Sequence, residues 1–387
     1  MNNFIFENKA KVYFGKGGVK EYLGCLLDHY GDTVMLAYGC GSIKCNGVYD
    51  EVMGILNAKG KRVVEFSGIM SNPTYAKVQE GAKLARENHV DLILAVGGGS
   101  VSDCCKVVSA QAKLPEDIWE MQYTKHTYPS EFIPLGTIVT VFGTGSEMNN
   151  GAVITHEEKK IKGALWGAQA EFAFLDPSYT LSVPMKQVIS GAFDTLSHAM
   201  ETYFGKPDEN NLSDDLGEAV MRSVIRNIRV LLTDPENYDA RSELAWASAM
   251  AENGVLKIGK VTDFQCHMIE HQLGAYTNCN HGAGLAVIHP VLYRHIYKSG
   301  AARFARWAQN VWGIAPKGSE EETAAAGIDA LTSFIREIGL PTAFAELGIP
   351  ADTDFRAVAD STNITAGCCK KLTHDEIYDI LCECKSN

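Results

Sequence analysis

The sequence predicts a chain of two parts: a Rossmann-like α/β domain with a parallel sheet over residues 1–182, then an all-helical domain over residues 183–387. Three observations support this fold class. The length of 387 residues exceeds what a single hydrophobic core usually serves. The first half alternates apolar strand patterns with helical patterns, which is typical of a parallel sheet covered on both faces. Beyond Pro184 the apolar residues recur mostly at helical spacing.

The expected strands of the first half are short and rich in Val, Ile and Leu, as in sheets that are buried on both faces. In chain order we expect strands at 33–38, 61–66, 92–96 and 133–142, and helices at 47–57 and 75–88. Pro184 stands shortly behind Ser182, a combination typical of a helix start. We therefore place the domain boundary near residue 182.

Helical periodicity then continues to the end of the chain, without internal repeats or low-complexity tracts. The expected helices span residues 185–204, 212–232, 240–257, 263–275, 284–299, 301–312, 320–338 and 374–384. A region of this kind predicts a separate helical domain and not an extension of the sheet.

Composition and charge exclude several classes of partner. Hydrophobic residues make up 46% of the chain and charged residues 21%, the balance of a globular protein. The net charge of −12 argues against nucleic acid or an anionic membrane as the main partner. The longest uncharged run, residues 132–146, is too short to span a bilayer.

The cysteines and the amino terminus indicate a location. The 11 cysteines include two adjacent pairs but no CxxC motif, a usage typical of reduced thiols. The opening residues, MNNFIFENKAKVYFGKG, lack the basic and apolar regions of a signal peptide. We therefore expect a cytoplasmic protein.

Three loops that contain glycine follow predicted strands. LILAVGGGSVSD places Gly97, Gly98 and Gly99 between a strand and a helix. Glycine allows close approach of a ligand to the backbone, and the N–H groups of a helix start attract phosphate. YGCGSIK (38–44) and TVFGTGSEMNN (140–150) follow their strands in the same way. Any one loop is also explained as a tight turn, but three loops at one edge of a parallel sheet predict a dinucleotide site.

The helical half carries polar residues on faces that are otherwise apolar. Asp194 and His198, in GAFDTLSHAM, are four residues apart and share a helix face. His267 and His271 repeat this spacing, and His281 follows beside a glycine at a helix start. One carboxylate and two or three imidazoles with an open position are typical of a catalytic Zn²⁺ or Fe²⁺ site. A single helical histidine is usually a core or solvated residue, but several such groups without a ligand would leave unmet hydrogen bonds.

A competing motif overlaps this cluster. His267-Met-Ile-Glu270-His271 matches H-x-x-E-H, the inverted zinc-peptidase motif, in which Glu270 would be the general base. This alternative leaves Asp194, His198 and the glycine loops unexplained, so we rank it below a metal-dependent dehydrogenase.

Together the motifs resemble those of the iron-containing (group III, metal-dependent) alcohol dehydrogenases, which share their fold with dehydroquinate synthase. The resemblance runs nearly end to end, through YFGKGG, GGGSVSDCCK, GTGSE, LDP, DTLSHAME and NHGAGLAVIHP. YGCGSIKCNGVYDEV and GTGSEMNNGAVIT are similar in particular to the branch of NADPH-linked butanol dehydrogenases and aldehyde reductases.

The resemblance implies a role for each motif. Asp194, His198, His267 and His281 would bind one divalent metal, Fe²⁺ or Zn²⁺, and His271 would face the substrate as a proton relay. The implied contacts of the dinucleotide are Gly39, Gly41 and Ser42 at the adenosine end, Gly98, Gly99, Ser100 and Asp103 near the pyrophosphate, and Thr140, Thr144, Asn149, Lys162 and Leu181 along the nicotinamide.

Residues 38–44 also predict which dinucleotide is preferred. Sites that prefer NAD(H) usually place an acidic side chain on the ribose hydroxyls, where it repels the 2′-phosphate of NADP(H). The segment YGCGSIK contains no acid and offers Ser42 and Lys44 to a phosphate. We therefore expect NADPH to be preferred, with NADH as a possible second cofactor.

The expected substrates are primary alcohols and aldehydes of butanol and butanal size, and the expected assembly is a homodimer or higher homo-oligomer. Two alternatives stay open beside the peptidase. One is a polyol dehydrogenase of the glycerol type, which shares the fold. The other is a nucleotide-binding regulatory protein without turnover, against which the complete ligand set argues.

Overall fold

A computed structural model describes residues 2–385 of the chain. Within this range the chain forms two compact units. Glu7–Pro184 form an α/β unit, and the residues from Met185 onward form a helical unit together with the first residues up to Phe6. The predicted combination of a parallel-sheet domain and a helical domain is confirmed.

The α/β unit is built on a six-stranded sheet in which every neighbouring pair of strands is parallel. Across the sheet the order is β1 (Lys11–Phe14), β8 (Phe172–Leu175), β5 (Leu135–Val139), β4 (Leu92–Gly97), β2 (Thr33–Tyr38) and β3 (Arg62–Phe66). Because β5, β4 and β2 are neighbours, the loops that follow these three strands share one edge of the sheet.

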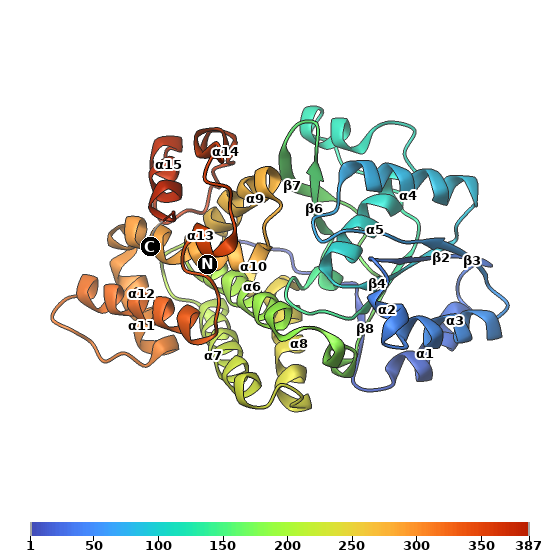
Figure 1. Cartoon of the computed structure of the whole chain (residues 1–387), viewed down its shortest axis with the longest axis horizontal. Helices are drawn as coiled ribbons and strands as arrows, with labels where there is room; N and C mark the ends of the chain where they lie inside the picture. Colours follow the sequence, from blue (N-terminus) through green and yellow to red (C-terminus); the bar gives the residue numbers. More distant parts are fainter. Residues whose placement is uncertain (1, 386–387) are drawn as a thin grey trace. The chain divides into compact units, whose positions relative to one another are not determined.

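Helices cover both faces of this sheet (Figure 1). In β2, Val34 and Leu36 pack into one core and Met35 and Ala37 into the other, so the strand is buried on both faces. The first core contains residues of α1 (Gly18–Leu27) and α3 (Val48–Ala58), and the second contains residues of α4 (Tyr75–Glu87) and α5 (Gly99–Gln111).

An antiparallel hairpin of β6 (Gly151–His156) and β7 (Ile161–Trp166) packs on α5. The sequence pattern did not predict it. Ala152, Ile154 and Leu165 join the core beneath the hairpin. The hairpin therefore holds the end of the third glycine loop against α5.

The helical unit is a bundle with one continuous core. Its helices are α6 (Met185–Tyr203), α7 (Leu212–Thr233), α8 (Tyr238–Glu252), α9 (Gln265–Thr277), α10 (His281–Ile296), α11 (Ala301–Trp312), α12 (Glu320–Glu337), α13 (Phe344–Leu347), α14 (Phe355–Ser361) and α15 (His374–Glu383). Among the described residues, no helix combines the length and the apolar character that crossing a membrane requires.

Several expected boundaries differ from the structure; the helix expected at 240–257, for example, ends at Glu252. Two of the differences bear on the candidate site. The strand expected at 133–142 ends at Val139, where the chain leaves the sheet for the third glycine loop. The helix expected at 284–299 already begins at His281, because the side chain of Asn280 accepts a hydrogen bond from the backbone N–H of Ala283 and caps it. This earlier start places His281 in the first turn of α10.

Candidate active site

Three helices bring the predicted metal ligands together in the helical unit. Asp194 and His198 lie one turn apart on α6, His267 lies on α9, and His281 is the first residue of α10. Asp194, His198 and His267 are buried, and the side chain of His281 is 25% exposed. The four residues predicted from separate motifs therefore form one cluster.

The ligand atoms of this cluster converge on one carboxylate oxygen. Asp194 Oδ1 lies 3.4 Å from His267 Nε2, 3.4 Å from His281 Nε2 and 3.7 Å from His198 Nδ1. Asp194, His267 and His281 offer ligand atoms that all lie within 4.8 Å of one another. The ring of His198 stacks on that of His267, with 4.5 Å between their centroids.

Three of these atoms are buried and have no hydrogen-bond partner: Asp194 Oδ1, His198 Nδ1 and His267 Nε2. Buried polar atoms in native proteins are almost always satisfied. A divalent ion bound to all of them would satisfy them together, and one carboxylate with imidazoles is a donor set that Fe²⁺ and Zn²⁺ accept. The residues present therefore fit the metal that the motifs predict.

The electrostatics of the cluster suit a cation. Burial opposes ionisation of Asp194, but the imidazoles of His198 and His281 hold the pKa of this carboxyl well below its usual value. Burial lowers the pKa of His198, which favours the neutral imidazole that metals bind.

Two buried glutamates orient the imidazoles. Glu201 accepts a hydrogen bond from His267 Nδ1, and Glu270 accepts one from His281 Nδ1. Metal-binding histidines are commonly held in this way, because the bond to Nδ1 aims Nε2 at the metal. The sequence pattern did not single out Glu201, although it follows Asp194 by seven residues and thus shares its face of α6.

The geometry does not support the H-x-x-E-H peptidase. The general base of such an enzyme must reach water. Glu270, however, is 0% exposed, and its carboxylate accepts a hydrogen bond from His281. The buried ring of His271 lies beside the predicted metal ligands. Its centroid is 5.9 Å from that of the His267 ring and 5.5 Å from that of the His281 ring. His271 therefore lies beside the cluster on α9.

The glycine loops of the α/β unit lie at one sheet edge, as their positions in the sequence predict. Gly39 and Gly41 follow β2, and Gly98 and Gly99 follow the neighbouring strand β4. Gly41 has φ of 108°, in the left-handed region that favours glycine. A Cβ atom on Gly99 would lie 2.1 Å from Thr144 Oγ1 of the third loop. The backbone around Gly98 and Gly99 therefore forms a cradle, a space that a side chain at Gly99 would fill.

The same cradle includes the start of α5. Gly98 caps this 13-residue helix without a side-chain hydrogen bond. The first N–H groups of such a helix carry a partial positive charge and point at whatever lies before it. Ser100, in the first turn, donates its hydroxyl to the carbonyl of Ser71. The open helix start and the absence of Cβ atoms fit a pyrophosphate.

Asp103 and Asn149 hold the third glycine loop in place. Asp103 Oδ1 accepts a hydrogen bond from Ser146 Oγ at 2.5 Å, and its Oδ2 accepts one from Val153 N at 2.8 Å. Asn149 Oδ1 accepts a hydrogen bond from Lys106 Nζ at 3.0 Å. The fully buried Lys106 was not among the predicted residues, although it follows Asp103 by one turn of α5.

The other predicted cofactor contacts also lie in the α/β unit. Thr140 is buried directly after β5, Thr144 belongs to the third loop, and Ser42 begins the short helix α2 (Ser42–Cys45) after β2. Lys162 is buried on β7. Leu181, 44% exposed, lies in the turn after β8, the strand next to β5.

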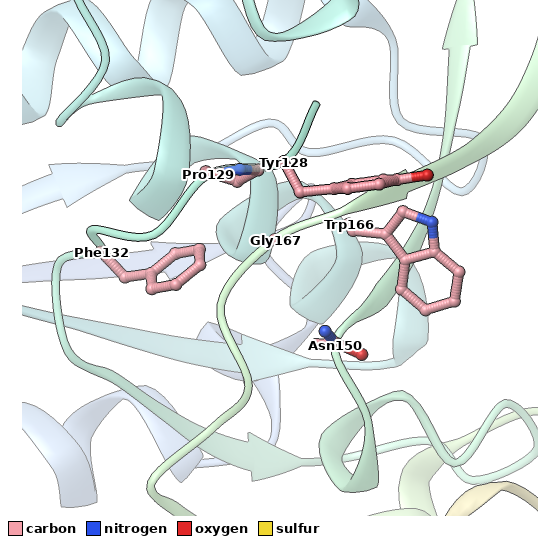
Figure 2. A pocket seen from close by; sticks show the side chains of 6 residues that line it. All are labelled: Tyr128, Pro129, Phe132, Asn150, Trp166 and Gly167. Atoms are coloured by element: carbon pink, nitrogen blue, oxygen red, sulfur yellow. The ribbon is translucent and has the colours of Figure 1, made fainter. Parts of the chain in front are cut away.

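A pocket of about 340 Å³ also opens on the α/β unit. Figure 2 shows its aromatic side chains, with Trp166 at the end of β7. None of its lining residues is among the predicted cofactor contacts; they are Tyr128, Pro129, Phe132, Asn150, Trp166 and Gly167.

The buried Asp–His cluster and the glycine-lined sheet edge are characteristic of metal-dependent dehydrogenases that use a nicotinamide cofactor. The family model "Iron-containing alcohol dehydrogenase" matches residues 9–177, and the model of the C-terminal part of the same family matches residues 188–384. The chain belongs to the iron-containing alcohol dehydrogenase family.

Individual relatives cover nearly the whole chain. A probable NADH-dependent butanol dehydrogenase of Bacillus subtilis (strain 168) is 38% identical, with 98% of this chain and 99% of the relative covered. The NADPH-dependent aldehyde reductase YqhD of Escherichia coli (strain K12) is 36% identical, with 90% of each chain covered. The crystal structure of NADH-dependent butanol dehydrogenase A from Thermotoga maritima has a TM-score of 0.94 at 32% identity, covering 100% of this chain and 99% of the other.

These findings confirm the predicted family, the two-part fold and the assignment as an NAD(P)-dependent alcohol dehydrogenase or aldehyde reductase. Family membership implies a nicotinamide cofactor and a divalent metal. The relatives are named for NADH in some cases and for NADPH in others.

Proposed function

We propose that the chain interconverts primary alcohols and aldehydes of about butanol and butanal size, with NADPH preferred over NADH and with Fe²⁺ or Zn²⁺ bound to Asp194, His198, His267 and His281. One observation carries the metal assignment: a carboxylate oxygen and two imidazole nitrogens are buried together without hydrogen-bond partners. The names of the relatives support the substrate class.

When bound, the metal supplies Lewis-acid polarisation of the alcohol or aldehyde oxygen, and the nicotinamide supplies or accepts the hydride. The protein contributes the rest. Asp194 balances positive charge at the centre, and Glu201 and Glu270 keep the imidazoles of His267 and His281 aimed at it. These fixed groups lower the cost of reorganisation when charge develops on the substrate oxygen.

We assign the proton transfer that accompanies hydride transfer to His271. Its ring lies on α9 one turn beyond His267, beside the metal cluster, and an imidazole exchanges protons near neutral pH. In the reductive direction, its ring nitrogen would return a proton to the nascent alkoxide, with water as the final donor.

The nucleotide-binding domain proposed at residues 1–182 would bind the dinucleotide, and the catalytic domain proposed at residues 183–387 would bind the metal. Asp103 would act by holding the third loop, because both of its carboxylate oxygens accept internal hydrogen bonds. The assigned contacts are Gly39, Gly41 and Ser42 for the adenosine, Gly98, Gly99 and Ser100 for the pyrophosphate, and Thr140, Thr144, Asn149, Lys162 and Leu181 for the nicotinamide.

NADPH preference follows from the residues after β2. The segment of Gly39, Gly41 and Ser42 contains no acid that could meet the ribose. Lys44 follows Ser42 by two residues and offers an ammonium group to a 2′-phosphate. A cytoplasmic location and a homodimer or higher homo-oligomer remain part of the proposal.

The decisive test is butanal-dependent oxidation of NADPH by anaerobically purified protein, with and without a metal chelator. We expect activity that the chelator removes and that added Fe²⁺ or Zn²⁺ restores, and elemental analysis should find close to one equivalent of metal. Glycerol as the better substrate would favour the polyol alternative, and metal-independent activity would contradict the assignment.

A further inference from the structure

A cluster of four side chains lies at the edge of the sheet, beside the glycine loop of residues 38–44. Glu65, near the end of β3, accepts hydrogen bonds from the hydroxyl of Tyr38 and, at 2.7 Å, from that of Tyr49. Its carboxylate also accepts a hydrogen bond from Lys44 Nζ at 3.3 Å. Glu65, Lys44, Tyr38 and Tyr49 are called the Glu65 cluster below.

Lys44 is held on more than one side in this cluster. Its ammonium nitrogen lies 4.4 Å from the ring centroid of Tyr49 and 5.1 Å from that of Tyr38, within the range of cation–π attraction. The side chains of Lys44 and Glu65 are nonetheless 47% and 42% exposed. Both charges are therefore accessible to a ligand at this edge.

The position of Glu65 is set by the pairing of two strands. In the parallel register of β2 and β3, Leu36 is the partner of Glu65, and Gly39 follows β2 three residues after Leu36. In dinucleotide-binding folds, an acidic side chain outside the pyrophosphate loop meets the ribose hydroxyls. The loop after β2 lacks an acid of its own, and the neighbouring strand supplies one.

We propose that Glu65 is a specificity-determining residue for the 2′-position of the adenosine ribose, and that it restrains the preference for NADPH by engaging Lys44 and by repelling a 2′-phosphate. The proposal rests on the proposed dinucleotide site at this edge. It adds a residue that lies far in sequence from the glycine loop, with an effect opposite to that of Lys44.

The expected size follows from the exposure of the cluster. Unit charges about 5 Å apart interact weakly in water and several times more strongly near a protein surface. Removing the charge of Glu65 should therefore change the relative affinity for a 2′-phosphate by about three- to tenfold. Screening by salt should reduce the change.

The experiment uses the whole chain and two probes that differ in the position of the second phosphate: 5′-ADP carries it on the 5′-phosphate, and 2′,5′-ADP carries it on the 2′-oxygen of the ribose. Isothermal titration calorimetry gives the affinity of each probe and hence their ratio, independently of catalytic activity. The variants are Glu65→Gln and Lys44→Met. The control is Glu116→Gln, which removes the same charge from another exposed ion pair of this unit, with Lys125.

We expect Glu65→Gln to raise the affinity for 2′,5′-ADP relative to 5′-ADP by about three- to tenfold, Lys44→Met to lower it at least threefold, and Glu116→Gln to leave it within twofold of wild type. A ratio unchanged or lowered in Glu65→Gln overturns the proposal. An unchanged ratio in Lys44→Met overturns it as well, which keeps the test decisive if Glu65→Gln does not fold.

Different results would refute the role of Glu65 and the dinucleotide site itself. If wild type binds both probes but Glu65→Gln does not change their ratio, only the role of Glu65 is refuted. If wild type binds neither 5′-ADP nor 2′,5′-ADP, the dinucleotide site is refuted together with the inference.

Discussion

Substituting Glu270 with Gln tests how the metal centre is held. The side chain is completely buried, and its carboxylate accepts the hydrogen bond from His281 Nδ1. Gln has nearly the same shape and still offers an oxygen to this N–H group. The variant therefore removes the negative charge behind the imidazole and leaves the packing almost unchanged.

Two estimates of the expected loss in metal-binding free energy agree. A hydrogen bond to a charged group contributes about 1.5–3 kcal/mol. Removing the partner that orients a metal-binding histidine typically weakens metal binding by about 10–100-fold, which corresponds to about 1.4–2.8 kcal/mol. We therefore expect Glu270→Gln to bind Zn²⁺ or Fe²⁺ about 10–100-fold more weakly than wild type, and to recover most of its aldehyde reduction at saturating metal.

The assay is a competition titration of metal-free protein against a chromogenic chelator, with Zn²⁺ in air and Fe²⁺ under anaerobic conditions. Glu383→Gln is the matched control, because Glu383 accepts a hydrogen bond from His295 at 3.0 Å on the surface of the same unit. Its metal affinity should equal that of wild type.

A metal affinity of Glu270→Gln within twofold of wild type would refute the role of this carboxylate in orienting His281. The same variant also separates the two enzyme classes. Hydrolysis of peptides by wild type that disappears in Glu270→Gln would overturn the assignment as a dehydrogenase, since only a peptidase needs Glu270 as general base.

Further predictions concern the ligands, the cofactor and the stability of the helical unit. His281→Ala should lose turnover and bound metal, measured by elemental analysis, while binding of 5′-ADP stays at the wild-type level; full metal content would remove His281 from the ligand set. Gly39→Asp should shift kcat/KM toward NADH, because the new charge repels a 2′-phosphate; an unchanged ratio of NADPH to NADH would contradict this. Asp214→Asn should lower the free energy of unfolding in urea by about 3–5 kcal/mol, because it removes the carboxylate that pairs with the buried side chains of Lys260 and Arg303; a loss below about 1 kcal/mol would show that these two ion pairs contribute little to stability.

The sequence was sufficient for features that depend on near neighbours in the chain. Spacing of four residues places Asp194 and His198 on one helix face whatever surrounds the helix. A fully apolar run such as 92–96 indicates a buried strand, and the glycines behind it indicate a turn that a ligand can approach closely. These signals predicted the fold class and the motifs of the candidate site.

Other features carry no local signal. The hairpin of β6 and β7 went unpredicted, because its stability comes from packing on α5 and not from its own pattern. Glu201 is an ordinary helix residue in sequence, and only the docking of α9 on α6 brings its carboxylate to His267. Glu270 looks like the base of a peptidase until its partner His281 is known.

Cofactor preference depends partly on the local sequence and partly on the tertiary structure. Residues 38–44 contain no acid, and this much the sequence by itself determined. That Glu65 stands beside Lys44 was decided by the tertiary structure, because β3 pairs with β2 although α2 and α3 separate the two strands in the sequence. Periodicity and caps arise from interactions over a few residues, whereas charge pairing between a strand and a distant helix depends on contacts that only the folded chain creates.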